Sequence, residues 1–275
     1  REDSRVLSTV LIYAALPAMI FRAVHTAKLT PELAVIAGIA WVVLLLGLGL
    51  GWLLGRALKL EGPTFGGFVL CCAFGNTGFI GYPIAQALMG DVGLVRAIFY
   101  DVFGTVAVAL TIGLGLAIRY GVHGSAEGHN PIKEALTFPA VVALFVGLAL
   151  RPVSIPTPVS DGLGILANMV VPLVTFTLGL SLEAGSFRRA LVPAAVVSAI
   201  KLAVLPIAAW GLGSLLLGSS EAVGLVVLQA GVPCMMLVLV FALRTGLDTG
   251  FIAATILLST VASAVTIPIL QLLVR

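Results

Sequence analysis

Two long apolar stretches of the sequence are interrupted at corresponding places, and the interruptions could bind an anion. The helix-breaking or polar residues are Gly75, Asn76, Thr77 and Pro83 in the stretch 64–89, and Pro233 and Cys234 in the stretch 221–243. Glycine relaxes a helix, and proline removes a backbone donor. The N-terminus of the half-helix after such a break has free N–H groups that suit a carboxylate. The pattern predicts a substrate-binding site, although packing glycines and a kinking proline are the alternative for either stretch alone.

Two ionisable residues lie inside apolar stretches. These residues are Asp101 and Lys201. A charge at the centre of a membrane helix costs about 2.5–3.5 kcal/mol, so each needs a partner or a function. We expect them to pair with each other and to serve proton coupling or charge compensation for the anion. The alternatives are an Asp101 solvated at the headgroup level and a Lys201 held by backbone carbonyls.

The remaining polar residues do not form a catalytic pattern. The three histidines (His25, His123 and His129) fall in or near loops, and no HExxH, GxSxG or Walker pattern occurs. The three cysteines lie in apolar runs and are expected to act as small apolar residues. We therefore expect no enzyme, no metal site and no cofactor. Tyr13 and Asn168 are candidate cavity-lining residues, with half-buried packing as the alternative.

Composition places these residues in an all-α polytopic membrane protein. Of 275 residues, 60% are hydrophobic and 10% are charged, which excludes a soluble domain and a disordered chain. Basic residues are scattered, so no nucleic acid partner is expected, and the partner surface is the lipid bilayer. Nine apolar segments are candidate spans: 5–24, 31–55, 64–89, 94–119, 134–151, 158–181, 189–217, 221–243 and 249–274.

The distribution of Lys and Arg predicts the orientation. Nine of these residues fall before the first segment or after every second one, and five fall on the other side. This bias places residue 1 and the polar loop 120–133 in the cytoplasm and the C-terminus outside, in a plasma membrane.

An internal repeat divides the chain. ALPAMIF at 15–21 resembles VVPLVTF at 170–176, and 73–90 resembles 229–246, at offsets of 155 and 156. We expect two inverted halves, 1–119 and 134–275, joined by the linker 120–133. The first half shows four segments where the second shows five. The repeat therefore predicts a ten-span (5+5) plan whose first helix this chain lacks, with a natural nine-span protein as the alternative.

Glycines at every fourth position mark a packing surface on the second segment. Gly47, Gly51 and Gly55 predict a small-residue seam against which another helix packs closely. The alternative, a nucleotide-binding loop, is disfavoured because no strand precedes these glycines.

Several motifs together resemble the auxin efflux carrier family, which includes bacterial malate permeases. They are GNTGFIGYP, LMGD and IFYDVFG in the first half, LPAMIF near the start, and VPLVTFTLGLSLE and QAGVPCMMLVLVFAL in the second half. The resemblance covers essentially the whole chain. It implies a crossed-helix transporter of the NhaA and bile-acid-symporter type that moves small organic anions by an elevator motion.

The resemblance also assigns parts of this chain. It implies that 64–89 and 221–243 are the two broken helices that cross at the substrate, with Asn76 as an amide donor and Pro233 matching the family. Cys234 stands where plant members tend to have a polar amide, which suggests an acid other than auxin. The scaffold would comprise 5–24, 134–151 and 158–181, with a homodimer forming through it. The mobile domain would comprise 31–119 and 189–274.

Two other functions are weighed against this one. A sodium-coupled carrier of the bile-acid type shares the crossed-helix plan, so the coupling ion is H⁺ or Na⁺. A non-transporting membrane receptor would use the same site for binding alone.

Overall fold

The computed structural model describes residues 6–7, 9–122, 136–170, 172–173 and 187–274, and this part of the chain consists of helices and short connections without strands. This confirms the all-α class. Four helical stretches are long and apolar enough to cross a membrane: Glu32–Ala57, Thr77–Tyr120, Leu191–Leu216 and Thr249–Leu272. The protein is therefore a polytopic membrane protein, while nine spans and an inverted repeat stay predictions.

Helices lie in each of the nine predicted segments. In the first half they are η1 (Leu11–Ala15), α2 (Leu16–Thr26), α3 (Glu32–Ala57), α4 (Gly62–Ala73), η2 (Thr77–Gly81), α5 (Tyr82–Tyr100), η3 (Asp101–Val106), η4 (Ala109–Gly113) and α6 (Leu114–Tyr120). In the second half they are α8 (Pro139–Ala149), α9 (Thr157–Asn168), α11 (Phe187–Ala199), η5 (Ile200–Val204), α12 (Leu205–Leu216), α13 (Ser220–Ala230), α14 (Leu237–Thr245) and α15 (Thr249–Val274). Residues 123–133 of the predicted linker, with His123 and His129, and residues 174–181 of the sixth segment lie outside the described residues.

The predicted boundary between the third and fourth segments falls within α5. Gly90 has a φ of 64° and a ψ of −158°, a backbone conformation that interrupts the helix. Only glycine adopts such angles without strain, because it has no Cβ. Residues 82–89 therefore complete the stretch that began with α4, and the chain after Gly90 begins the next one.

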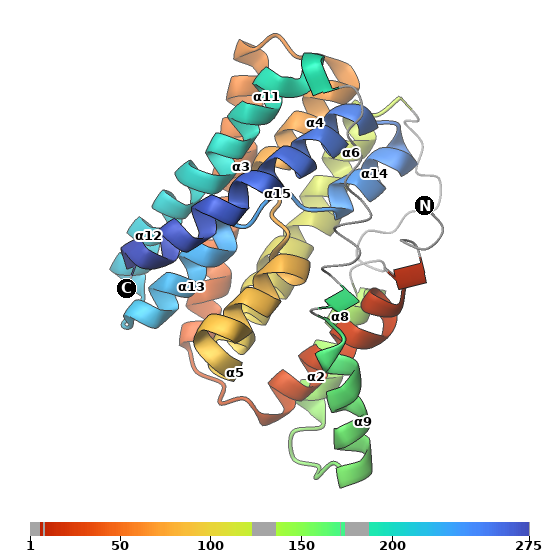
Figure 1. The fold of residues 1–275 in the computed structure, drawn as a ribbon, viewed down its shortest axis with the longest axis vertical. Helices are drawn as coiled ribbons and strands as arrows, with labels where there is room; N and C mark the ends of the chain where they lie inside the picture. The colour runs from red at the N-terminus through yellow and green to blue at the C-terminus, as the bar shows by residue number, and fades with distance from the viewer. Residues whose placement is uncertain (1–5, 8, 123–135, 171, 174–186, 275) are drawn as a thin grey trace.

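The helices form two groups (Figure 1). In the smaller group, α2 packs against α8 and α9. In the larger group, α3 packs against α4 and α12, α13 against α12 and α5, and α15 against α11. Contacts between α2 and α5 connect the two groups.

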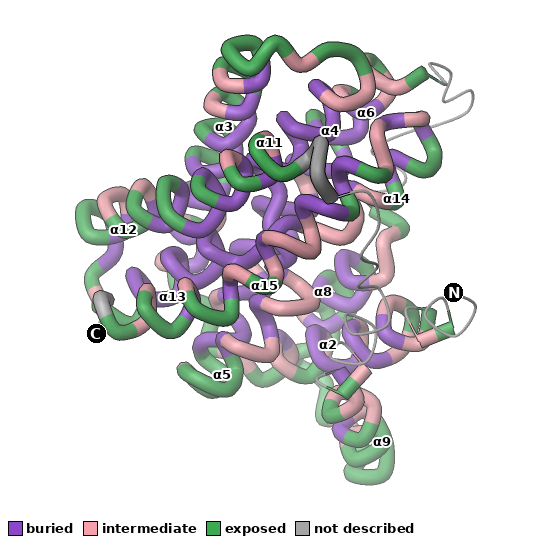
Figure 2. The backbone as a smooth tube through the Cα atoms, turned by 45° about the horizontal axis from the view of Figure 1, so that its top comes forward, coloured by how far each residue is buried: buried purple, intermediate pink, exposed green. Residues whose placement is uncertain are grey.

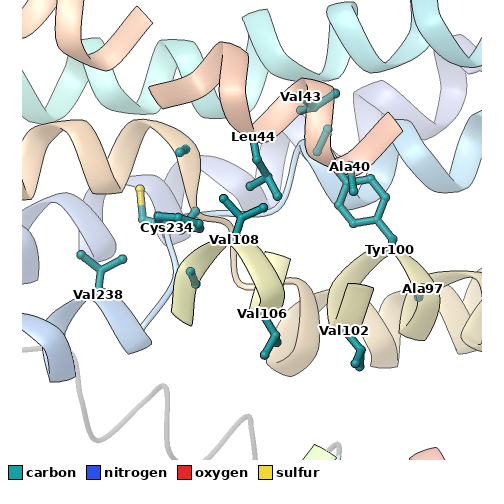
Figure 3. Close-up of a cluster of buried hydrophobic side chains, with 14 of the residues drawn as sticks. Ala40, Val43, Leu44, Ala97, Tyr100, Val102, Val106, Val108, Cys234 and Val238 are labelled. Carbon is teal, nitrogen blue, oxygen red and sulfur yellow. The ribbon is translucent and has the colours of Figure 1, made fainter. Parts of the chain in front are cut away.

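The buried centre of the larger group lies where α4 and α13 end. Residues 65–77 and 222–234 are buried without interruption, and Figure 2 shows this central burial against the exposed outer faces of α3 and α12. Side chains of α3 and α5 enclose the same region: Figure 3 shows Tyr100 beside Ala40, and Val108 close to Cys234. Any polar group held here is shielded from water by protein.

The predicted glycine seam on α3 is confirmed as the surface that receives α4. A Cβ added to Gly47 would lie 2.8 Å from the Cα of Ala73, and one added to Gly51 would lie 3.0 Å from the Cα of Val69. These close approaches fix the height of the C-terminal end of α4, where the helix breaks.

We expect Gly47→Ala to destabilise the protein and Gly49→Ala to leave it unchanged or slightly stabilised. The added methyl at residue 47 meets backbone, and such overpacking costs about 1–3 kcal/mol. Gly49 is on the same helix with nothing within 4 Å of an added Cβ, so only the helix propensity gain of up to about 1 kcal/mol remains. The midpoint of SDS-induced unfolding in detergent measures both, and equal midpoints for the two variants would contradict the seam.

Candidate functional site

The two interrupted stretches cross each other at their breaks. Gly75 and Cys234 form an isolated antiparallel bridge. The N–H of Asn76 donates to the carbonyl of Pro233 at 2.8 Å, and the N–H of Met235 donates to the carbonyl of Phe74 at 3.0 Å. Each break thus satisfies backbone groups of the other, which is required of non-helical backbone inside an apolar environment.

Side chains pair some of the other backbone groups released at the breaks. The N–H of Cys234 donates to Oγ of Ser259 at 3.1 Å, and the Cys234 thiol donates to the carbonyl of Cys71 at 3.4 Å. In an unbroken helix the Cys71 carbonyl would accept from residue 75, so the thiol replaces a lost helical bond. The Cys234 side chain is therefore directed at α4.

Lys201 caps the C-terminal ends of both α4 and α13. Its ammonium group, carried on η5, donates to the last carbonyl of α4, that of Ala73, at 3.3 Å and to the last carbonyl of α13, that of Ala230, at 3.1 Å. Lys201 is only 2% exposed. Each helix C-terminus carries about half a negative charge, so the two ends together offset one buried ammonium.

The expected Asp101–Lys201 pair is not formed, and no ion pair within the described residues joins them. Lys201 instead has the carbonyl partners that we named as its alternative. The reason is geometric, because Lys201 sits at the carbonyl ends of α4 and α13 whereas Asp101 contacts the chain that starts the next half-helix.

Asp101 is held by two hydroxyl groups. Thr77 donates to one carboxylate oxygen, and the Tyr82 hydroxyl donates to the other at 2.6 Å. Asp101 is 4% exposed, so the alternative of a carboxylate solvated at the headgroup level is wrong. Since Thr77 directly follows Asn76, its hydrogen bond connects the Asp101 carboxylate to the crossing.

Asn76 and the first turn of η2 provide unused hydrogen-bond donors. The Asn76 side chain, 4% exposed, makes no hydrogen bond within the described part of the chain. The N–H groups of Thr77, Gly78 and Phe79 likewise enter none of the hydrogen bonds found there. An amide NH₂ next to three N–H groups at a helix N-terminus can bind a carboxylate.

The other predicted site residues are placed differently. Pro83 lies where η2 continues into α5, within the helical stretch Thr77–Tyr120, and not in the break itself. Asn168, the last residue of α9, lines a cavity of about 390 Å³ between α2, α5 and α9. Tyr13 does not line that cavity and is 70% exposed.

Residues missed by sequence reasoning also support the crossing. Gln229, in α13, is fully buried and donates to the carbonyl of Ala97 at 3.4 Å. A Cβ on Gly81 would lie 2.0 Å from Gln229 Oε1, so the glutamine fits against η2 only because residue 81 is glycine. In the sequence, Gln229 could have been noticed as the one side-chain amide in the apolar run 222–230. Tyr82 and Ser259 carried no signal beyond one hydroxyl in an apolar segment.

Comparison with known proteins shows the family of the chain. The family described as "Membrane transport protein" matches residues 1–121 and 129–271. The chain belongs to this family, the auxin efflux carriers. The resemblance noted in the sequence is thereby confirmed, and the protein is a member of a family of membrane transporters.

Similar proteins include an "Uncharacterized transporter" of Methanothermobacter thermautotrophicus, 32% identical over 98% of this chain and 88% of its own. Another "Uncharacterized transporter", from Methanocaldococcus jannaschii, is 29% identical over 97% of this chain and 88% of its own. A "Putative malonate transporter" of Rhizobium meliloti is 27% identical over 98% of this chain and 86% of its own.

We expect Ser259→Ala to destabilise the fold by about 1–3 kcal/mol, because the N–H of Cys234 would be buried without an acceptor. Ser263→Ala is the matched control. Ser263 is also a buried serine of α15 whose hydroxyl bonds within its own helix, to the Thr260 carbonyl at 2.7 Å. Unfolding midpoints in detergent measure both variants, and an equal loss for each would show that Ser259 does not support the break.

Proposed function

We propose that the protein is a secondary carrier of small carboxylates that bind at the helix crossing. The observation that carries the proposal is the set of free donors at Asn76 and the first turn of η2, in a buried site of a transporter fold. A carboxylate bound there would accept from the Asn76 amide and from N–H groups at the positive end of the half-helix.

Electrostatics favour an anion at this place. The Lys201 ammonium lies close to the break, since a Cβ on Gly75 would be 2.9 Å from its Nζ. The carbonyls that would repel an anion are already bonded to Lys201, at Ala73 and Ala230. The buried carboxylate of Asp101, which accepts from Thr77 and Tyr82, would repel an anion in its ionised form and not in its protonated form.

A small acid fits the residues at the crossing better than a large one. The thiol of Cys234 donates to Cys71 and its N–H donates to Ser259, so this residue has no side-chain donor left for a second group of the substrate. The relative from Rhizobium meliloti is named for malonate. We therefore propose a short mono- or dicarboxylate, with malonate as the first compound to test.

The two groups of helices support an elevator mechanism. We propose that α2, α8 and α9 belong to a static scaffold and that the larger group carries the crossing past it. In this proposal the two breaks come from the inverted halves 1–119 and 134–275 of a ten-span plan, and the turn at Gly90 faces the outside.

Asp101 is proposed as the carrier of the coupling ion, a proton. Its two oxygens accept from two hydroxyls and no cation contacts it within the described residues, so protonation removes an uncompensated charge. Protonation would weaken the hydrogen bonds that the carboxyl group accepts from Thr77 and Tyr82, and Thr77 adjoins Asn76. Sodium-coupled transport would instead show as uptake that requires Na⁺.

We expect Asn76→Ala to lower the affinity for malonate roughly tenfold or more, and Asn76→Asp to abolish malonate uptake into proteoliposomes. Alanine removes the amide donors, and aspartate keeps the size while adding a repelling charge. Loss of one hydrogen bond to a charged group costs about 1.5–3 kcal/mol, or roughly tenfold or more in affinity. Ser263→Ala is the control for purification and reconstitution into liposomes. Uptake by Asn76→Asp at the wild-type rate would exclude the crossing as the site, and binding without flux under any gradient would indicate a receptor.

We expect Asp101→Asn to separate exchange from coupled transport. Asparagine mimics the protonated carboxyl, so counterflow of labelled malonate against unlabelled malonate should persist. Stimulation of net uptake by an outside-acid gradient between pH 5 and 8 should be lost, whereas Lys201→Ala should impair both modes by weakening the crossing. If Asp101→Asn and Lys201→Ala both transported at the wild-type rate over this pH range, the coupling role would be wrong.

A further inference from the structure

A second polar cavity lies apart from the crossing, between the two groups of helices. It has a volume of about 390 Å³ and is lined by α2 and α9 on one side and by α5 on the other. The polar side chains on its walls include Arg22, His25, Thr26, Gln86, Asp91 and Asn168. Gln86 follows Asn76 by ten residues, which corresponds to about 15 Å of helix toward the predicted outer side.

Arg22 presents a free cationic group to this cavity. Its guanidinium lies over α9, where a Cβ on Gly164 would be 2.9 Å from Nη1. Within the described residues the Arg22 side chain makes no hydrogen bond or ion pair. Two arginines nearby are engaged: Arg96 pairs with Glu32 at 2.7 Å, and Arg151 donates to the Ala27 carbonyl.

The neighbouring polar groups are of two kinds. Asn168, at the end of α9, supplies an amide beside Arg22. On the opposite wall Gln86 donates to Asp91 at 3.4 Å, so this amide is occupied by the one carboxylate that lines the cavity. His25 is fixed by the carbonyls of Leu150 and Val153, each 3.0 Å from its Nε2. The free donors are therefore on the α2 and α9 side.

We propose that this cavity is a second carboxylate-binding site, in which Arg22 and Asn168 hold a small anion at the outer end of its path to the crossing. The proposal takes its ligand class from the proposed function. Guanidinium groups bind carboxylates through two parallel hydrogen bonds, and a positive charge at the mouth of a path raises the local anion concentration. Asp91 on the far wall repels the same anion and limits how tightly it is held.

The polar lining favours a soluble carboxylate over a lipid. A phospholipid headgroup offers similar chemistry to Arg22, but its acyl chains need an apolar wall. An apolar groove within the described residues lies elsewhere, between α3, α8 and η3, where Leu33, Trp41 and Phe103 line a cavity of about 580 Å³.

The test compares three single charge changes in malonate uptake at low salt. Arg22→Gln should raise KM roughly fivefold with little change in the maximal rate, the size expected for one charge in a hydrated site. Asp91→Asn should lower KM roughly twofold to threefold, because it removes repulsion. Lys28→Gln is the matched control, since Lys28 carries the same charge on the adjacent loop but does not line this cavity.

Opposite effects of Arg22→Gln and Asp91→Asn are the signature of an anion site. If both variants impair uptake and the charge swap Arg22→Asp with Asp91→Arg restores it, the two residues form a latch and the proposal is overturned. The proposal is equally overturned if Arg22→Gln matches Lys28→Gln.

A binding measurement separates this site from the crossing. Labelled malonate should bind weakly to the Asn76→Ala protein in detergent, and adding Arg22→Gln should remove that binding at least fivefold. The assay needs no transport, so it stands even if the proposed carrier function fails. Retained binding in the double variant overturns the second site. The same holds if anionic phospholipid in nanodiscs occupies Arg22 and malonate does not displace it.

Discussion

The structure depends on the requirement that every backbone group inside an apolar environment find a partner. Breaking one helix there would leave several groups unpaired at a large cost in free energy. Here two breaks meet, and the pairs Asn76–Pro233 and Met235–Phe74 satisfy backbone groups of both at once. The packing around the breaks must satisfy the same requirement, because the crossing forms only if the C-terminal ends of α4 and α13 lie at the same depth in the helix bundle. The close contact of Gly47 with Ala73 sets that depth for α4.

Carbonyl groups released at the breaks are bonded within the protein, whereas several of the N–H groups in the described part of the chain are not. This difference supports the proposed preference for an anion. The released carbonyls of Ala73, Ala230 and Cys71 accept bonds from Lys201 and Cys234. The N–H groups that begin η2 are left without partners among the described residues. A site in which acceptors are used and donors remain suits the anionic substrate that we propose. The buried ammonium of Lys201 adds to this, because it neutralises the carbonyl ends of α4 and α13.

The sequence was sufficient for the features that depend on local composition. Runs of apolar residues predicted the helical segments, the glycine and proline clusters predicted the breaks, and four-residue spacing predicted the seam at Gly47 and Gly51. It was insufficient for contacts between distant segments. Asp101 and Lys201 were expected to pair because opposite charges attract, but the sequence could not show that helix ends would satisfy the lysine first. Ser259 could not be recognised because its role depends on which N–H group the fold brings to it.

The hydrogen bonds of Cys234 bear on the size of the proposed substrate. Its N–H is used by Ser259 and its thiol by Cys71, so the second break offers the ligand shape and backbone but no side-chain donor. The side-chain donors are then one-sided and come from Asn76, while the N–H groups of Met236 and Leu237 at the second break, like those at the start of η2, have no partner among the described residues. A one-sided donor set can orient a single carboxylate, so the remainder of the substrate must be small or carry its second charge toward the donors outside the crossing.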